Sequence, residues 1–527
     1  MRNRLTYALF GVLATLVGMA AGHLVASLLN PASSPVLAVG SQVIDLTPTP
    51  MKEWAIRRFG SNDKNVLIGS VLAGVLVLSA VAGLLARRRF RYGAALLVVL
   101  VAVAAFTALN RPAAEALDVL PSLATVLAGV GSLWLLDRRS TQTAAPAASH
   151  STGEAGSGGI SATNDVDAVV GGSSAPSRRG VLIAGGALAA AAAVMAGAGR
   201  RIGQYRSRLT DIAFPKPADP APAFPAGIEA DYPGITPLRV PTGDFYRVDT
   251  RLDVPIVDIE TWTLTIDGMV DEELTFTFDD LLAMPLVERD ITLTCVSNSV
   301  GGPYVGGARW IGVRLSDLLD KAGVQEGVDQ IFSTDVDGMT IGTPYELATD
   351  GRDAMIALGM NGEALPREHG YPARMVVPGL YGFISACKWI ERITLTTYAE
   401  KDSYWTDRDW ATHAPIKISS RIDTPKVLET IDAGETFIGG VAWAQQNGGV
   451  AKVQVQVDGG PWRDAQLGPS AGNDYWRQWY FPWTAEPGSH NLASRVIDGA
   501  GNTQTAVRAE PFPEGSSGIQ TLIVKVA

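Results

Sequence analysis

Cysteine and histidine are scarce in this sequence, whose 527 residues include two cysteines and five histidines. An iron–sulfur cluster needs about four such ligands, and covalently attached haem needs a C-x-x-C-H motif, which the sequence lacks. Only His23 lies in a hydrophobic run, so the apolar half cannot supply the two axial histidines of an ordinary membrane b-type haem. We therefore expect neither haem nor an iron–sulfur cluster in this chain.

An excess of positive charge and a nucleotide-binding glycine motif are also missing. The formal net charge is -10 at pH 7 and the isoelectric point is about 5.2, whereas surfaces that bind nucleic acid are basic. No G-x-G-x-x-G motif follows a predicted strand, so a dinucleotide-binding fold is not indicated. These absences argue against nucleic acid as a partner.

Apolar and polar residues occupy different parts of the chain. Residues 1–200 are rich in Ala, Leu, Val and Gly, whereas nearly all Trp, Asp and Glu residues follow residue 225. About 20 apolar residues suffice to cross a bilayer, although buried core helices would also give apolar runs. The sequence predicts five transmembrane spans, at residues 5–29, 66–86, 94–109, 120–136 and 181–198.

The positions of arginine predict the orientation of these spans. Arginines precede the first span, join the second to the third at residues 87–91, and follow the fourth at residues 138–139. Positive residues favour the cytoplasmic side, so the N-terminus is expected inside, although residues 52–64 then place Arg57 and Arg58 outside. Five spans put everything after residue 198 outside the cytoplasm.

A linker is predicted between the fourth and fifth spans, at residues 137–179. It has no Phe, Trp or Tyr and is crowded with Ala, Ser, Thr and Gly, so it cannot bury enough apolar surface to become ordered. It ends in Ser177-Arg178-Arg179-Gly180-Val181-Leu182, which resembles a twin-arginine export signal. The other interpretation is ordinary positive charge on the cytoplasmic side.

The second half of the sequence predicts a globular region. Short helical patterns at residues 278–282 and 315–322 are mixed irregularly with strand patterns at 262–268, 331–333, 374–377 and 393–397, which is typical of an α+β fold. From residue 421 onward almost no helical period remains. Residues 452–457 alternate into Asp458-Gly459, and residues 490–497 run into Asp498-Gly499, which predicts the hairpins of a small β-sandwich.

Cys295 is the residue that most clearly indicates chemistry. It lies in Thr294-Cys295-Val296-Ser297-Asn298, between an acidic strand pattern and a glycine-rich loop at residues 301–307. A thiolate suits a soft metal, and the Arg, Lys and His residues further along the chain suit a phosphate-bearing cofactor. Four further blocks accompany it, at residues 244–247, 308–319, 369–379 and 387–389.

The order and spacing of these blocks resemble the sulfite oxidase family of molybdopterin enzymes from about residue 236 to the C-terminus. That family includes the periplasmic methionine sulfoxide reductase catalytic subunit and actinobacterial membrane-anchored proteins. The resemblance implies an α+β catalytic domain at residues 225–415 and an immunoglobulin-like β-sandwich at 416–527 that mediates dimerisation. These follow the membrane region at residues 1–136, the linker at 137–179 and the fifth span at 180–199.

The resemblance also implies a set of site residues. Cys295 corresponds to the molybdenum ligand, whereas Cys387 follows Ser385-Ala386 in a strand-like run and is expected to be a packing residue. A buried structural thiol is the alternative for Cys295 as well. The residues that correspond to contacts with the pterin and its phosphate are Tyr246, Arg247, Thr334, His369, Arg374, Ser385 and Lys388. Salt bridges or surface hydrogen bonds are the alternative for each of them alone.

Three positions bear on the substrate. Arg247 also corresponds to an arginine that binds the substrate anion of sulfite oxidases. Trp410 stands where those enzymes carry an active-site tyrosine, and an indole donates one hydrogen bond but cannot act as a phenol. Tyr381 is the candidate for a nearby replacement hydroxyl. Asp244 replaces an asparagine of some relatives.

Together these features predict a multi-pass protein of the cell membrane with its catalytic domain outside the cytoplasm. It would be a molybdenum-dependent oxidoreductase carrying out two-electron chemistry, with oxygen-atom transfer at the sulfur of a small molecule as the expected reaction. The alternatives are a reductase of sulfoxides or other S- or N-oxides, and a non-catalytic membrane scaffold that keeps the fold. The expected partners are the lipid bilayer, a separate cytochrome or quinone-linked electron carrier, and a second copy of the chain.

Overall fold

The computed structural model describes residues 3–48, 51, 54, 58–59, 62–141, 178–209 and 212–527. Two compact units result: one contains residues up to Arg208 together with Arg251–Asp253, and the other contains Leu209–Thr250 and Val254–Ala527. Most of the predicted linker, residues 142–177 with Ser177 at its end, lies outside the described residues. The side chains of Arg178 and Arg179 lie outside them as well. The twin-arginine interpretation therefore stays a prediction.

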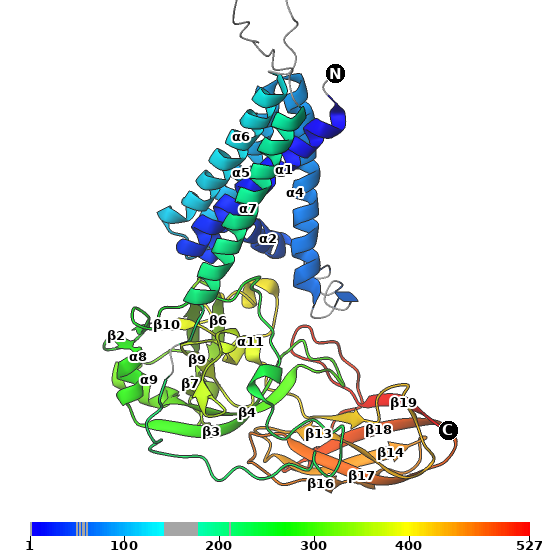
Figure 1. Cartoon of the computed structure of the whole chain (residues 1–527). Coiled ribbons are helices and arrows are strands. Elements are labelled where there is room, and N and C mark those ends of the chain that lie inside the picture. The colour runs from blue at the N-terminus through cyan, green and yellow to red at the C-terminus, as the bar shows by residue number, and fades with distance from the viewer. Residues whose placement is uncertain are drawn as a thin grey trace, which may run out of the picture. The chain divides into compact units, whose positions relative to one another are not determined.

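The first unit is a bundle of apolar helices, the blue to green ribbons of Figure 1. Five stretches are long and apolar enough to cross a membrane, as the sequence predicts. They lie in α1 (Arg4–Leu28), α4 (Asp63–Arg88), α5 (Phe90–Leu109), α6 (Leu120–Thr141) and α7 (Arg178–Arg206). The sequence analysis did not predict the short apolar helix α2 (Pro35–Leu46), and α7 extends beyond the predicted fifth span at both ends.

Small residues let the bundle helices approach closely. A Cβ atom on Gly11 of α1 would lie 1.9 Å from the Ser79 carbonyl oxygen of α4, and one on Gly83 would lie 1.9 Å from the Tyr7 carbonyl oxygen. Any larger residue at either glycine would push α1 and α4 apart. This contact is the type that holds helices together in an apolar surrounding, where hydrophobic burial between helices contributes little.

The second unit contains one mixed sheet and one antiparallel sheet, which form the α+β region predicted from the sequence. One sheet has the strand order β2-β1-β10-β5-β6, in which β1 and β10 are parallel and the other pairs antiparallel. The other is built on β3, β4, β7 and β8, with β9 beside β7. The strands are β1 (Thr263–Gly268), β2 (Leu274–Thr277), β3 (Leu286–Thr294), β4 (Val305–Arg314), β5 (Gln330–Asp335), β6 (Thr340–Pro344), β7 (Met355–Met360), β8 (Glu363–Ala364), β9 (Arg374–Val376) and β10 (Ile390–Thr396).

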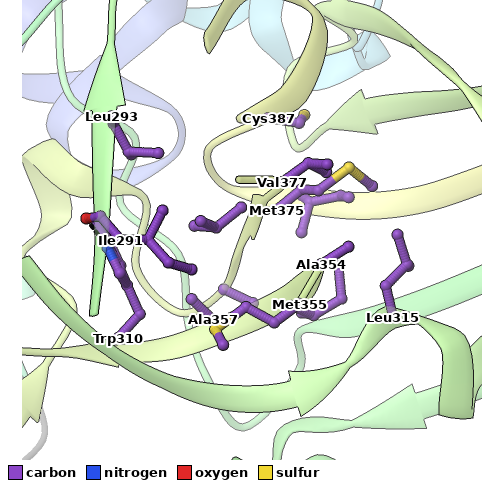
Figure 2. Close-up of a cluster of buried hydrophobic side chains, with 14 of the residues drawn as sticks. Ile291, Leu293, Trp310, Leu315, Ala354, Met355, Ala357, Met375, Val377 and Cys387 are labelled. Atoms are coloured by element: carbon purple, nitrogen blue, oxygen red, sulfur yellow. Dashed lines mark hydrogen bonds between the residues drawn. The ribbon is translucent and has the colours of Figure 1, made fainter. Parts of the chain in front are cut away.

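Short helices cover these sheets: α8 (Phe278–Ala283), α9 (Leu315–Ala322), α10 (Tyr345–Ala348) and α11 (Gly382–Ser385). The shared core contains Trp310, Met355 and Met375, which are fully buried. Figure 2 shows Cys387 at the upper edge of this cluster, above the labelled Val377 and Met375. Cys387 is 1% exposed, so the prediction that it is a packing residue is confirmed.

The C-terminal region is a sandwich of two sheets. Their orders are β11-β13-β17-β16 and β12-β19-β18-β14-β15, and buried side chains from both sheets form one core cluster. The immunoglobulin-like assignment of this sandwich stays a prediction. Its strands are β11 (Ser419–Thr424), β12 (Thr430–Ile431), β13 (Gly434–Trp443), β14 (Val450–Val457), β15 (Arg463–Asp464), β16 (Gln466–Leu467), β17 (Arg477–Ala485), β18 (Gly488–Asp498) and β19 (Gln520–Val526).

The sandwich and the α+β region are joined through buried side chains. The Tyr475 hydroxyl and the Trp476 indole N–H both donate to the Leu238 carbonyl oxygen, at 2.9 and 2.7 Å. The Trp476 backbone N–H donates to Thr292 Oγ1 at the end of β3. Leu238 is buried in the core and lies in the segment before β1. The end of β3, which leads directly to Cys295, is therefore bonded to the segment that precedes β17.

Candidate functional site

Cys295 follows the last residue of β3 and opens the connection to β4. Its backbone N–H donates to the Tyr304 carbonyl oxygen at 3.0 Å, and its own carbonyl oxygen accepts from the Asn298 N–H at 3.0 Å. The Asn298 side chain accepts from the Tyr304 N–H at 2.9 Å. These bonds fix the turn, which we call the Cys295 turn (residues 295–298). The thiol is half-buried, with its sulfur 2.9 Å from Ser297 Oγ.

Two buried cations lie next to each other on neighbouring backbone segments. Arg374 on β9 forms an isolated antiparallel bridge with Lys388. The Arg374 guanidinium lies 5.1 Å from the centre of the Trp310 ring and donates from Nη1 to the His369 carbonyl oxygen at 3.1 Å. Its buried Nε has no hydrogen-bond partner among the residues that the structure describes. A buried donor without an acceptor costs free energy unless a further group accepts from it.

A single carboxylate serves two of the cations here. Asp249 accepts from Lys388 Nζ at 2.8 Å and from Arg247 Nε at 2.7 Å. Its side chain is 6% exposed, whereas that of Arg247 is 32% exposed. Arg374 lies beside Lys388, so three cationic side chains occur here with one buried carboxylate. The resulting excess of positive charge suits an anion.

The pKa values of the cations reflect this crowding. Burial lowers the pKa of Lys388 to about 8, against the opposing effect of Asp249, and Arg374 and Arg247 lower it further. Burial also lowers the pKa of Arg374 to about 10. Burial raises the pKa of the Cys295 thiol, while the hydrogen bond from Ser297 and the charge of Lys388 oppose that rise. The thiol thus lies within electrostatic range of Lys388.

Tyr246 and His369 complete the surroundings of Arg374. Burial, and then the nearby Cys295, raise the pKa of the Tyr246 phenol, while Arg374 lowers it. Burial, and then Arg374 and Lys388, lower the pKa of His369 to about 4, so its ring is neutral at pH 7. The ring Nε2 is 3.3 Å from the Thr242 carbonyl oxygen, to which its N–H donates.

Two predicted cofactor-binding residues are not brought into this group. The Ser385 hydroxyl is fully buried and bonds to the carbonyl oxygens of Leu380 and Tyr381, both at 3.0 Å. Thr334 lies on β5 opposite Thr340 and Arg392. Among the described residues, no hydrogen bond or ion pair joins Thr334 to Cys295, Arg374 or Lys388.

The two predicted substrate-side aromatic residues lie in different settings. Tyr381 is buried, and its phenol oxygen accepts from the Lys417 backbone N–H at 3.4 Å. Burial and the nearby Cys295 raise the pKa of Tyr381 to about 12, while the bond from Lys417 opposes that rise. Trp410 is half-buried, with its ring centre 5.5 Å from Phe383, 5.6 Å from Trp405 and 5.2 Å from Phe512. Tyr381 thus lies near the thiol, while Trp410 belongs to an aromatic cluster.

Sequence analysis missed Asp249 and Tyr304. Asp249 follows Arg247 by two residues, and in an extended segment such residues point to the same side, so this spacing was a usable signal. Tyr304 orders the Cys295 turn through its backbone, and its ring centre lies 6.4 Å from that of Tyr246. No local pattern points to a residue that acts through its backbone.

The residues present fit a metal held within an anionic cofactor. No group of three or more His, Cys, Asp or Glu side chains that could hold a metal occurs among the described residues, so a metal at Cys295 would need ligands other than such a group. The unpartnered Nε of Arg374 and the buried, unpartnered Thr294 Oγ1 both offer donors. Cys295 could bind the metal, while Arg374, Lys388 and Arg247 could bind an anionic group such as a phosphate.

Comparison with known proteins agrees with this interpretation. Residues 251–405 match the oxidoreductase molybdopterin binding domain. Mitochondrial sulfite oxidase of Macaca fascicularis is 30% identical over 318 residues, which are 51% of this chain and 58% of that protein. Its Homo sapiens counterpart is 29% identical over 320 residues, again 51% and 58% of the two chains. The NADH nitrate reductase of Hordeum vulgare is 28% identical over 49% of this chain and 33% of that protein.

Among solved structures, the sulfane dehydrogenase SoxCD of Paracoccus pantotrophus is 26% identical and covers 55% of this chain and 81% of its own, with a TM-score of 0.49. This chain spans a little over half the length of the sulfite oxidases that it matches. The matched domain contains Cys295, Arg374 and Lys388. The chain therefore contains an oxidoreductase molybdopterin binding domain and is similar to sulfite oxidases over about half of its length.

Proposed function

We propose that this chain is a membrane-anchored molybdenum oxidoreductase that works outside the cytoplasm and carries out oxygen-atom transfer at the sulfur of a small molecule. The observation that carries the proposal is the half-buried Cys295 thiol within range of a buried excess of positive charge, in which Arg374 Nε has no acceptor. Such a set of donors is costly to keep buried unless an anion binds there.

The residues have separate tasks in this proposal. Cys295 is the protein ligand of the metal, and Arg374 and Lys388 bind the phosphate of the pterin. Arg247, the most exposed of the three cations, binds the substrate anion, and Asp249 orients both Arg247 and Lys388. Half-buried Tyr246 offers its phenol O–H next to Arg374, and neutral His369, whose N–H donates to the Thr242 carbonyl oxygen, adds no charge. The molybdenum, when bound, supplies the two-electron change, and the protein supplies orientation and electrostatics.

A second candidate function is the reduction of a sulfoxide or another S- or N-oxide. Trp410 favours it, because its indole lies among Phe383, Trp405 and Phe512, a setting that suits an uncharged substrate better than sulfite. The third alternative, a non-catalytic scaffold, does not explain why the buried donors of Arg374 and Thr294 lack hydrogen-bond partners. We therefore rank it last.

The five apolar helices support the proposed attachment to a membrane, and the arginine-rich connections support the proposed orientation. Electrons would pass to or from a separate cytochrome or quinone-linked partner. This partner is proposed because the sequence offers no C-x-x-C-H motif and too few cysteines for a cluster. Association of two copies through the C-terminal sandwich is part of the same proposal.

The first prediction concerns the metal. Protein purified from a host that makes the molybdenum cofactor should contain molybdenum in equal amount to the chain. Cys295→Ser should lose activity while folding normally, because an alcohol oxygen is a harder ligand than a thiolate. Metal analysis and circular dichroism would be measured together, with Cys387→Ser as the matched control. Wild-type protein without molybdenum from such a host would contradict the proposal.

The second prediction concerns pH. Because the pKa of Lys388 is lowered to about 8, its charge is present below that pH and is lost as the pH rises through it. Molybdenum retained through gel filtration should therefore fall between about pH 7 and pH 9.5, whereas Lys388→Arg should retain it, because a guanidinium stays charged. Both proteins should retain equal amounts at pH 7. An equal loss from both at high pH would show that Lys388 is not the group responsible.

The third prediction concerns topology. A reporter that is active only outside the cytoplasm should be active when fused at Ala527 and inactive when fused after Arg91, in the arginine-rich connection of residues 87–91. If the twin-arginine signal is used, replacing Arg178 and Arg179 together by Lys should trap the Ala527 reporter inside. An active reporter in that double variant would leave the two arginines with an orienting role only.

The fourth prediction concerns the substrate. Arg247→Gln should weaken transition-state binding of sulfite by about 1.5 to 3 kcal/mol, the contribution of one charge-assisted hydrogen bond, and should affect a neutral sulfoxide much less. Trp410→Tyr should raise sulfite turnover only modestly, because the aromatic cluster around it also differs from a sulfite site. Steady-state kinetics with both substrates would measure this, at matched molybdenum content.

Arg392→Gln is the control for the fourth prediction, because Arg392 forms a comparable ion pair with Asp267 on the β1–β10 sheet. Fast oxidation of sulfite by the wild-type protein would show that Trp410 does not exclude it.

A further inference from the structure

A loop of the C-terminal sandwich reaches the Cys295 turn. It lies between β18 and β19 and is closed at its base by an antiparallel bridge, in which Ala509 and Ser517 exchange hydrogen bonds at 3.1 and 3.2 Å. We call residues 509–517 the C-terminal strap. This bridge closes the strap into a loop of its own.

The tip of the strap is bonded directly to the Cys295 turn. The Ser516 hydroxyl donates to the Asn298 carbonyl oxygen at 2.6 Å. The Asn298 N–H in turn donates to the carbonyl oxygen of Cys295. The strap is therefore bonded to the turn that carries the thiol, at the residue whose N–H binds the Cys295 carbonyl oxygen.

The strap also packs on both predicted substrate-side aromatic residues. A Cβ atom on Gly515, whose φ is +96°, would lie 2.5 Å from the Tyr381 ring, so only glycine fits there. The Pro513 carbonyl oxygen accepts from the Ala411 N–H at 3.2 Å. The Phe512 ring meets Trp410 edge-to-face and is 39% exposed. Tyr381 and Trp410 thus share one neighbouring segment, although they lie in different settings.

One charge pair marks this contact. Lys417 Nζ binds the Glu514 carboxylate at 3.1 Å and donates to the Gly515 carbonyl oxygen at 2.8 Å. The backbone N–H of the same Lys417 donates to the Tyr381 phenol oxygen. Glu514 and the Cys295 thiol both raise the pKa of that phenol, so both act on the same group. The side chains of Lys417 and Glu514 are 30% and 56% exposed.

We propose that the C-terminal strap is a substrate-selecting wall of the Cys295 site, in which Glu514 neutralises Lys417 and so disfavours anionic substrates relative to neutral ones. The inference rests on the proposed function, since it concerns the substrate of the same site. Unpaired, Lys417 would attract an anion such as sulfite. With Glu514 in place, an incoming anion meets a carboxylate and must compete with it for the ammonium group.

The test uses the full-length protein and sulfate as an unreactive anionic probe. The apparent sulfate affinity is taken from the rise in the thermal unfolding midpoint during a sulfate titration. Glu514→Gln should bind sulfate about 3- to 10-fold more tightly, because it leaves Lys417 without its counter-charge, and this gain should vanish near 1 M NaCl. Lys417→Gln should bind sulfate more weakly than the wild type.

The matched control is Glu510→Gln, which removes an exposed carboxylate from the same strap. It should leave sulfate affinity unchanged. Lys417→Gln also loses the bond to Gly515, which can lower its thermal unfolding midpoint in the absence of sulfate. In that case the sulfate affinities of Glu514→Gln and Glu510→Gln are compared instead, and they decide the test. Equal sulfate affinity in wild type and Glu514→Gln would overturn the inference, and so would an equal gain in Glu510→Gln.

A kinetic measurement gives the second readout. At matched molybdenum content, Glu514→Gln should lower the KM for sulfite and leave the KM for dimethyl sulfoxide unchanged, whereas a purely structural strap would shift both together. The inference fails if both values shift equally. Molybdenum content itself tests the proposed function, so a metal-free protein would reject that function while the sulfate titration still reports on the strap.

Discussion

The shortage of negative charge around Arg374, Lys388 and Arg247 is the constraint on which the site depends. Arg247 and Lys388 share Asp249, Arg374 lies beside Lys388, and burial lowers the pKa of both Lys388 and Arg374. Keeping such charges together in the folded chain costs free energy that other contacts must offset. An anion bound here would accept from the unpartnered Nε of Arg374 and reduce the repulsion. Binding of an anionic cofactor and stability of this region are therefore expected to be coupled.

Close backbone packing is what brings these cations together. Gly370 has a φ of +110°, and a Cβ atom there would lie 3.1 Å from both the Arg374 side chain and the Lys388 backbone. Trp389, the residue after Lys388, is held in place by its indole N–H, which donates to the Arg367 carbonyl oxygen at 2.7 Å. The Trp310 ring supports the Arg374 guanidinium. The positions of the cations thus depend on one glycine and two tryptophans, none of which is charged.

Sequence predicted the parts of this structure that have a local signal. Run length gave the five apolar helices, and the neighbouring motifs around Cys295, Arg374 and Lys388 pointed to residues that the fold does bring close. Ser385 has a similar local signal, but its hydroxyl bonds to the backbone one turn earlier. The partnership of Ser516 with Asn298 spans 218 residues of chain and has no local pattern at all. Such contacts follow from tertiary packing.

The cations near the thiol differ in whether they have a carboxylate partner. Arg374 has no carboxylate partner of its own, whereas the more exposed Arg247 and Lys417 are each paired, with Asp249 and Glu514. A buried cation without a carboxylate partner favours tight binding of an anionic cofactor. A paired and partly exposed cation can exchange its carboxylate for a substrate anion at a small cost in free energy. The same chain can therefore hold a tightly bound anionic cofactor and still discriminate among substrates by charge. Substrate preference can then change at Glu514 or Asp249 without loss of the buried cation Arg374.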